Sequence, residues 1–164
     1  MYIKDLFLFF VFYQLMLYYL NIILMSVHNN KIIETMKNNI YTCENNSYGH
    51  VYIIINNFTP GKYTKKQKLM IIDYIIKVKR ESLVISNTNN NKTSYVHLYL
   101  TNCRRENFNL AWFKKINTIF SETFEDTLES MFIYSDSKLF LTLWKIIKNF
   151  IDKDTRDKIK LINC

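Results

Sequence analysis

Apolar residues along the chain recur at spacings that predict alternating strands and helices. Runs of β-branched, leucine or aromatic residues between polar turns predict four strands, at residues 51–56, 95–102, 131–134 and 159–162. Apolar residues three and four apart predict helices at residues 31–39, 64–83, 108–120 and 138–151, with one helical turn at 154–157. This alternation predicts an α/β fold with a mixed or parallel β-sheet of about four to five strands flanked by α-helices.

Two of the predicted helices have a clear division between an apolar and a polar side. In residues 138–151 one apolar stripe lies opposite a row of lysines, and its members are Phe140, Leu143, Trp144, Ile147, Phe150 and Ile151. In residues 64–83 a broad apolar stripe is opposed by basic positions, which are Lys65, Lys66, Lys68, Lys77, Lys79 and Arg80. A basic face of this kind is either solvated or lies against anionic lipid.

Residues 6–25 form an uncharged and mostly apolar run of 20 residues. At about 1.5 Å per residue, a helix of this length crosses a hydrocarbon layer of roughly 30 Å. We predict that residues 1–27 form an N-terminal hydrophobic helix that anchors the protein to a membrane, ahead of a domain at residues 31–164. Lys31 and Lys37 follow the run and favour a cytoplasmic position for that domain. Two alternatives are that the run is a buried helix of the domain, or that translation begins near Met25.

The composition argues against several classes of function. With two glycines and one proline, the chain has neither the dinucleotide fingerprint nor the P-loop pattern. A net charge of +8 suits an anionic partner, but the chain lacks the interleaved arginines and aromatic residues of a nucleic-acid surface. The cysteines have no histidine at metal-ligand spacing, so we expect no metal and no cofactor. Arg104 and Arg105 would lower the thiol pKa of Cys103, but no base is placed to activate it, and we expect no enzymatic activity.

Residues 124–162 resemble the most recognisable part of the CRAL-TRIO lipid-binding domain. In that family a helix of pattern F-x-x-x-W/F-x-x-hydrophobic-K-P-F-L precedes a segment D-x-x-T-x-x-K-I that begins a strand. The matching positions here are Phe140, Trp144, Lys148, Phe150, Asp152, Thr155, Lys158 and Ile159. Residues 48–55 are similar to an upstream strand of the family. Residues 95–120 resemble the divergent branch found in Rho-GAP-associated and BCH-type domains.

The chain departs from the family pattern at three places. Ser135, Asp136 and Ser137 stand where the family has N-A-P, and Asn149 stands where a proline follows the helix lysine. Family members continue past the last strand with a strand and a helix that help to close the pocket. The resemblance therefore implies a domain that is incomplete at its carboxyl terminus.

The resemblance also implies a site for a lipid. In members that transfer phosphatidylinositol, the positions that match Thr155 and Lys158 hold the lipid phosphate, and the position that matches Asp126 is an acidic group near the head group. The acyl chain would lie against the stripe formed by Phe140, Leu143, Trp144, Ile147 and Phe150. The plainer alternatives are that Thr155 only begins a helical turn, that Lys158 is solvated, and that the stripe packs on the sheet as an ordinary core.

We therefore expect non-enzymatic binding of a phospholipid or another hydrophobic small molecule at a membrane surface. Lipid transport and phosphoinositide signalling are the roles that the resemblance implies. The alternative is a protein-interaction scaffold that binds small GTPases or itself and has lost the lipid pocket. No nucleic-acid partner is expected.

Overall fold

The computed structural model describes the backbone of residues 3–136 and 138–164. Side chains are described at residues 15–20, 26, 27, 29–136, 138 and 140–164. The chain divides into two compact units, residues 1–34 and residues 35–164. The side chain of Ser137, in the segment that replaces N-A-P, lies outside the described residues.

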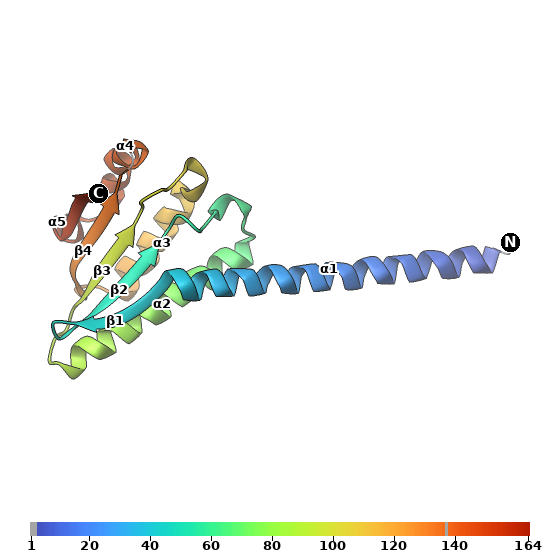
Figure 1. Ribbon diagram of the computed structural model, residues 1–164, viewed down its shortest axis with the longest axis horizontal. Helices are drawn as coiled ribbons and strands as arrows, with labels where there is room; N and C mark the ends of the chain where they lie inside the picture. The colour runs from blue at the N-terminus through green and yellow to red at the C-terminus, as the bar shows by residue number, and fades with distance from the viewer. Residues whose placement is uncertain (1–2, 137) are drawn as a thin grey trace. The chain divides into compact units, whose positions relative to one another are not determined.

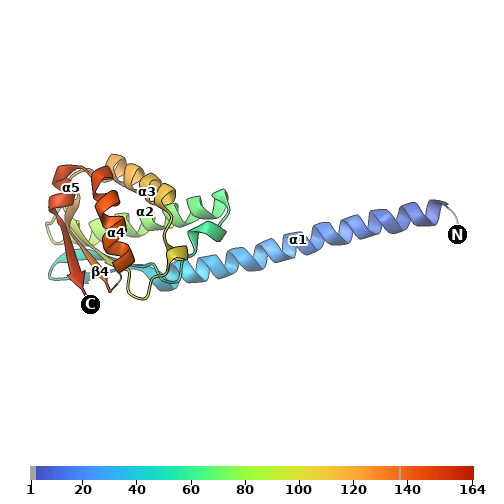
Figure 2. The same ribbon diagram turned by 90° about the horizontal axis from the view of Figure 1, so that it is seen from above.

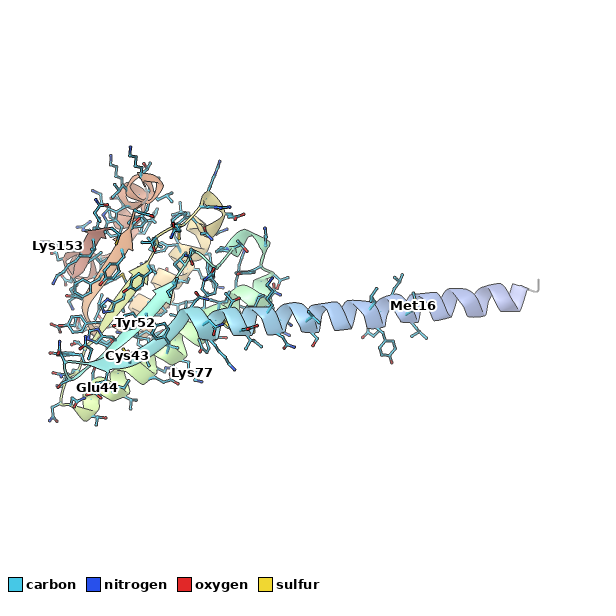
Figure 3. All side chains as sticks on the ribbon, viewed as in Figure 1. Met16, Cys43, Glu44, Tyr52, Lys77 and Lys153 are labelled. Carbon is cyan, nitrogen blue, oxygen red and sulfur yellow. The ribbon has the colours of Figure 1, made fainter. Side chains whose placement is uncertain are left out.

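The first unit consists of most of helix α1 (Ile3–Asn39). Several of its described apolar side chains are exposed, as Met16 illustrates in Figure 3, whereas Ile32 is buried. Among the described residues, no helix is both long and apolar enough to cross a membrane. Most of the predicted anchor, residues 6–14 and 21–25, has no described side chains, so the anchor stays a prediction from the sequence.

The second unit is a five-stranded sheet with helices between its parallel strands (Figure 1). The strands are β1 (Ile40–Asn45), β2 (Tyr48–Ile54), β3 (Ser94–Tyr99), β4 (Leu128–Ser135) and β5 (Ile159–Asn163). The helices are α2 (Lys65–Thr88), α3 (Leu110–Thr123), α4 (Lys138–Ile147) and α5 (Lys153–Asp157), with 3-10 turns at Pro60–Lys62, Arg105–Asn107 and Lys148–Phe150. The α/β class with a mixed sheet of four to five strands, predicted from the periodicities, is confirmed.

The strands lie in the sheet in the order in which they occur along the chain. β1 and β2 are antiparallel, while β2, β3, β4 and β5 are all parallel to their neighbours. Right-handed crossovers between successive parallel strands place their connections on one face of the sheet. Figure 2 shows α2, α3 and α4 on the same side of the strands, as this rule requires.

β1 is an element that the periodicity did not predict, because residues 44–49 read as a polar turn. Its residues pair with β2 in a hairpin whose two-residue loop is Asn46 and Ser47. Both loop residues have positive φ, 49° and 67°, as the common two-residue hairpin turn requires. The strand is largely exposed and its sequence, Tyr-Thr-Cys-Glu-Asn after Ile40, has no apolar run. An edge strand of this kind gives almost no signal in a hydrophobicity pattern.

Helix α2 lies against β2 at very close range. It begins with a capping box in which Thr64 and Gln67 satisfy each other's backbone N–H groups. Further along, the Ser86 hydroxyl accepts a hydrogen bond of 2.8 Å from the amide of Gly49 in β2. A Cβ atom at Gly49 would lie 1.9 Å from the backbone oxygen of Ser82, so only glycine allows this approach.

The sheet face opposite the helices is covered by aromatic side chains. The register places Tyr41, Tyr52, His97 and Tyr134, from β1, β2, β3 and β4, on this face. Neighbouring rings stack, with centroid distances of 5.1 Å for Tyr41–Tyr52 and 4.6 Å for Tyr52–His97. Figure 3 shows Tyr52 on β2, in front of the helices.

Two histidines extend this aromatic face by hydrogen bonding. His50 Nδ1 and His97 Nε2 are 2.8 Å apart, and the second ring nitrogen of His97 lies 3.1 Å from the Tyr134 hydroxyl. Burial lowers the pKa of both imidazoles, and the neighbouring His50 helps to lower that of His97 to about 4. Both ring nitrogens of His97 therefore have hydrogen-bond partners on this face of the sheet.

The close approach of α2 and β2 predicts unequal effects of alanine substitution at the two glycines of the chain. Gly49→Ala should lower the free energy of unfolding by about 3 kcal/mol or more, because its methyl group meets helix backbone rather than a movable side chain. Gly61→Ala is the matched control, since a Cβ there has nothing within 4 Å. Urea unfolding followed by circular dichroism measures both. Equal stability of the two variants would show that α2 does not lie on Gly49 as described.

Candidate functional site

A cavity of about 610 Å³ lies between the sheet and helices α3 and α4. The floor is made by side chains that alternate along three strands, and they are Val51, Ile53, Val96, Leu98, Met131 and Ile133. The described part of α3 contains no buried residue, although Trp112, Phe113 and Phe120 all line the cavity. An apolar helix face that stays only half-buried is typical of a cavity wall rather than of a close-packed core.

Helix α4 forms another wall with the stripe that the periodicity predicted. Phe140, Leu143, Trp144 and Ile147 all line the cavity. Phe140 is 4% exposed and packs in a cluster with Leu100 and Ile133, to which Trp144 adds a half-buried ring. The cavity and the core therefore share this helix.

Phe150 does not line the cavity, which corrects its placement on the stripe. The α-helix ends at Ile147, earlier than the periodicity predicts, and a 3-10 turn follows it. Ile151 continues the stripe instead, since it is buried and lines the cavity. The Phe150 ring is 40% exposed and has the Lys114 ammonium 3.7 Å from its centroid, an arrangement that suits the surface.

The three residues proposed to meet a head group lie at one end of the cavity. Asp126 precedes β4, while Thr155 and Lys158 precede β5, so all three lie at the amino-terminal edge of the parallel strands. Asp152 caps α5 by accepting a 2.7 Å hydrogen bond from the Thr155 amide. Hydrogen bonds from the Thr155 amide and hydroxyl lower the pKa of Asp152. Thr155 therefore lies in the first turn of α5, which begins at Lys153, and it also lines the cavity.

Lys79 lines the cavity, although the periodicity of residues 64–83 predicts that it lies on the basic outer face of α2. Its side chain is 2% exposed, whereas Lys77 on the outer side of the same helix is exposed (Figure 3). The signal was present in the spacing, because Lys79 follows the buried Ile72 by seven residues and the buried Ile75 by four. Burial and, to a smaller extent, the charge of Lys158 together lower the pKa of Lys79 to about 7.

Cys103 also differs from its sequence-based expectation. Burial raises its thiol pKa to about 11, and Asp136 acts in the same direction, so the neighbouring Arg104 and Arg105 do not produce a reactive thiolate. The side chain packs at the margin of the cluster around Leu100. Among the described residues there is also no group of three histidine, cysteine or acidic side chains that could hold a metal ion.

Comparison with known proteins identifies the fold family. The profile of the CRAL/TRIO domain matches residues 34–164, and the chain belongs to this family. The structure is similar to the crystal structure of Sfh5, with a TM-score of 0.58 and 13% sequence identity over 78% of this chain and 50% of that one. The chain thus spans half the length of that protein. A search of curated proteins finds no match.

Membership of the CRAL/TRIO family supports binding of a hydrophobic small molecule. Proteins of this family generally bind or transfer lipids and are not enzymes. The apolar floor and walls of the cavity agree with that class of ligand.

The division of α4 between core and cavity predicts different effects for its two aromatic residues. Phe140→Ala should cost about 3–5 kcal/mol of unfolding free energy, because the ring is buried in the cluster with Leu100 and Ile133. Trp144→Ala should cost only about 1–2 kcal/mol, because its half-buried ring faces existing empty space. Thermal or urea unfolding compares them, with the exposed Leu141→Ala as a control near zero. A larger loss at Trp144 than at Phe140 would mean that the cavity is filled by packed side chains.

Proposed function

We propose that this chain binds one phospholipid, or a related hydrophobic molecule with a phosphate head group, in the cavity between the sheet, α3 and α4. The observation that carries the proposal is the polarity of that cavity. Its floor and walls are apolar, and its cationic and hydroxyl groups lie together at one end. The volume of about 610 Å³ is within the roughly 300–1,000 Å³ of small-molecule sites in proteins.

In this proposal the acyl chain lies along α4, against Leu143, Trp144 and Ile147. The Lys158 ammonium and the Thr155 hydroxyl meet the phosphate, as the family resemblance implies. The ammonium serves as a point charge and the hydroxyl as a directional donor. Asp126 lies at the same end of the cavity and would accept hydrogen bonds from head-group hydroxyls.

Two further expectations rest on the sequence alone. The first is that residues 6–25 associate with a membrane and that the domain faces the cytoplasm. The second is that the protein binds small GTPases or associates with itself. Both stay predictions, and the cavity contributes nothing to either.

Lipid carried through purification tests the proposal directly. The protein, purified without detergent, is extracted with organic solvent and the extract is analysed by mass spectrometry. We expect one lipid class at close to one molecule per chain. Leu143→Arg should lose this lipid because it places a charge in the cavity, while Leu141→Arg on the exposed side of α4 should retain it. Folded protein without lipid, or equal lipid in both variants, would contradict the proposal.

The head-group assignment predicts unequal effects at two lysines. Lys158→Ala should weaken binding to phosphoinositide vesicles by about 1.5–3 kcal/mol, the contribution of a charge-assisted hydrogen bond. Lys66→Ala removes the same charge from an exposed position on α2 and should have a small effect that salt screens. Flotation assays at low and physiological salt compare the two. Equal losses that disappear together at higher salt would indicate diffuse surface attraction.

A further inference from the structure

Lys79 provides a buried cation at the polar end of the cavity. Its ammonium donates one hydrogen bond of 2.5 Å to the Ser94 hydroxyl and one of 3.1 Å to the backbone oxygen of Thr127. Both acceptors are neutral. An ammonium has three donors, so one N–H has no partner among the residues that the structure describes. Because Lys79 lines the cavity, a bound molecule can supply the missing acceptor.

The surroundings of Lys79 do not supply a counter-ion. The charged groups that line the same cavity are Lys158, Glu125, Asp126, Asp152 and Asp154. Within the described part of the chain, none of these carboxylates lies within 4.0 Å of the Lys79 or Lys158 ammonium. The two lysines instead repel each other, since the charge of Lys158 disfavours protonation of Lys79. A buried ammonium without a counter-ion is costly and tends to lose its proton.

The hydrogen bonds around Lys79 hold it in place rather than neutralise it. The Ser94 hydroxyl that it contacts is fully buried and lies 3.1 Å from the Ser82 hydroxyl. Ser82 donates its single proton to the backbone oxygen of Lys79 at 2.7 Å, so the Ser94 hydroxyl is the donor to Ser82. This network joins α2 to the start of β3 and fixes the ammonium at the cavity wall. A fixed cation beside apolar walls is an arrangement suited to an anion with an apolar tail.

We propose that Lys79 and Lys158 together bind one anionic group, a phosphate or carboxylate, at the end of an apolar tail in the cavity. This inference rests on the proposed lipid-binding function and adds a second cation to its head-group site. Binding of the anion favours the protonated form of Lys79. The complex should therefore take up a proton when it forms above about pH 7, where the free protein has lost it.

The sign of the pH effect follows from this coupling. Below about pH 7 the ammonium is already charged, and affinity should not change with pH on account of Lys79. Above that value, each pH unit should weaken binding by up to about tenfold, until the pKa in the complex is reached. A ligand whose own charge is constant in this range is needed to observe the effect. Phosphatidylglycerol, a phosphodiester, meets this condition, and diacylglycerol with the same acyl chains is its uncharged counterpart.

The experiment measures binding of brominated phosphatidylglycerol and brominated diacylglycerol by quenching of the two cavity tryptophans, Trp112 and Trp144. For the full chain we expect roughly tenfold or greater weakening of phosphatidylglycerol binding between about pH 6 and about pH 9, and no such change for diacylglycerol. Lys79→Met should reduce phosphatidylglycerol affinity about tenfold at the lower pH and remove the pH dependence. Lys77→Met, the exposed neighbour, should retain both. Circular dichroism establishes that each variant is folded.

A measurement on the unmodified chain keeps the inference testable if Lys79→Met does not fold. Calorimetric titration with phosphatidylglycerol near pH 8, in two buffers of different ionisation enthalpy, should show uptake of a proton on binding. No proton uptake, or a pH dependence unchanged in folded Lys79→Met, would overturn the role of Lys79 while leaving lipid binding intact. Failure of both lipids to bind would instead overturn the proposed function. Displacement of phosphatidylglycerol by an equal concentration of glycerophosphate would show that the anion site does not require a lipid tail and would overturn the inference.

Discussion

The sequential order of the parallel strands is the constraint on which the rest of the domain depends. Each step from β2 to β3, β4 and β5 moves to the next strand in the same direction. Crossovers of one hand between such strands place their helices on one face of the sheet. A sheet wound in both directions would receive helices on both faces. Here α2, α3 and α4 gather on one face (Figure 2), and the two faces of the sheet acquire different chemistry. The cavity forms on the helical face, and stacked aromatic rings occupy the other.

The aromatic face shows how a sheet side without crossover helices limits its contact with water. The rings of Tyr52, His97 and Phe132 stack across three strands at centroid distances of 4.6 and 5.2 Å, so each covers part of its neighbour. One hydrogen bond between His50 Nδ1 and His97 Nε2 satisfies two ring nitrogens that burial would otherwise leave unpaired, while His50 Nε2 has no partner among the described residues. Cross-strand pairs of this type stabilise a sheet through side-chain contact. The register of the strands is therefore fixed from both sides, by aliphatic packing on one and by stacking on the other.

Several parts of this arrangement could be predicted from the sequence. The parallel strands and the stripe of α4 follow from apolar periodicity, because residues buried against a sheet must be apolar at fixed spacing. β1 was missed since an exposed edge strand needs no apolar run. Phe150 was misplaced because a periodicity continues past the residue at which the helix ends. Thr155, Lys158 and Asp126 were found through a family pattern, and no rule of periodicity alone would have brought them to one end of a cavity.

Lys79 illustrates why polar residues at functional sites resist prediction. A lysine between apolar positions is nearly always solvated, and propensity gives no reason to bury it. Its burial requires the Ser94 hydroxyl and the Thr127 carbonyl, which come from segments 15 and 48 residues away. The same tertiary arrangement places Lys79 at the amino-terminal edge of the parallel strands, near Lys158. Open α/β sheets more often bind ligands at the carboxyl ends of their strands. In this domain the carboxyl ends lead to the aromatic and aliphatic residues around Leu100 and Phe140, which leaves the opposite edge as the polar end of the cavity.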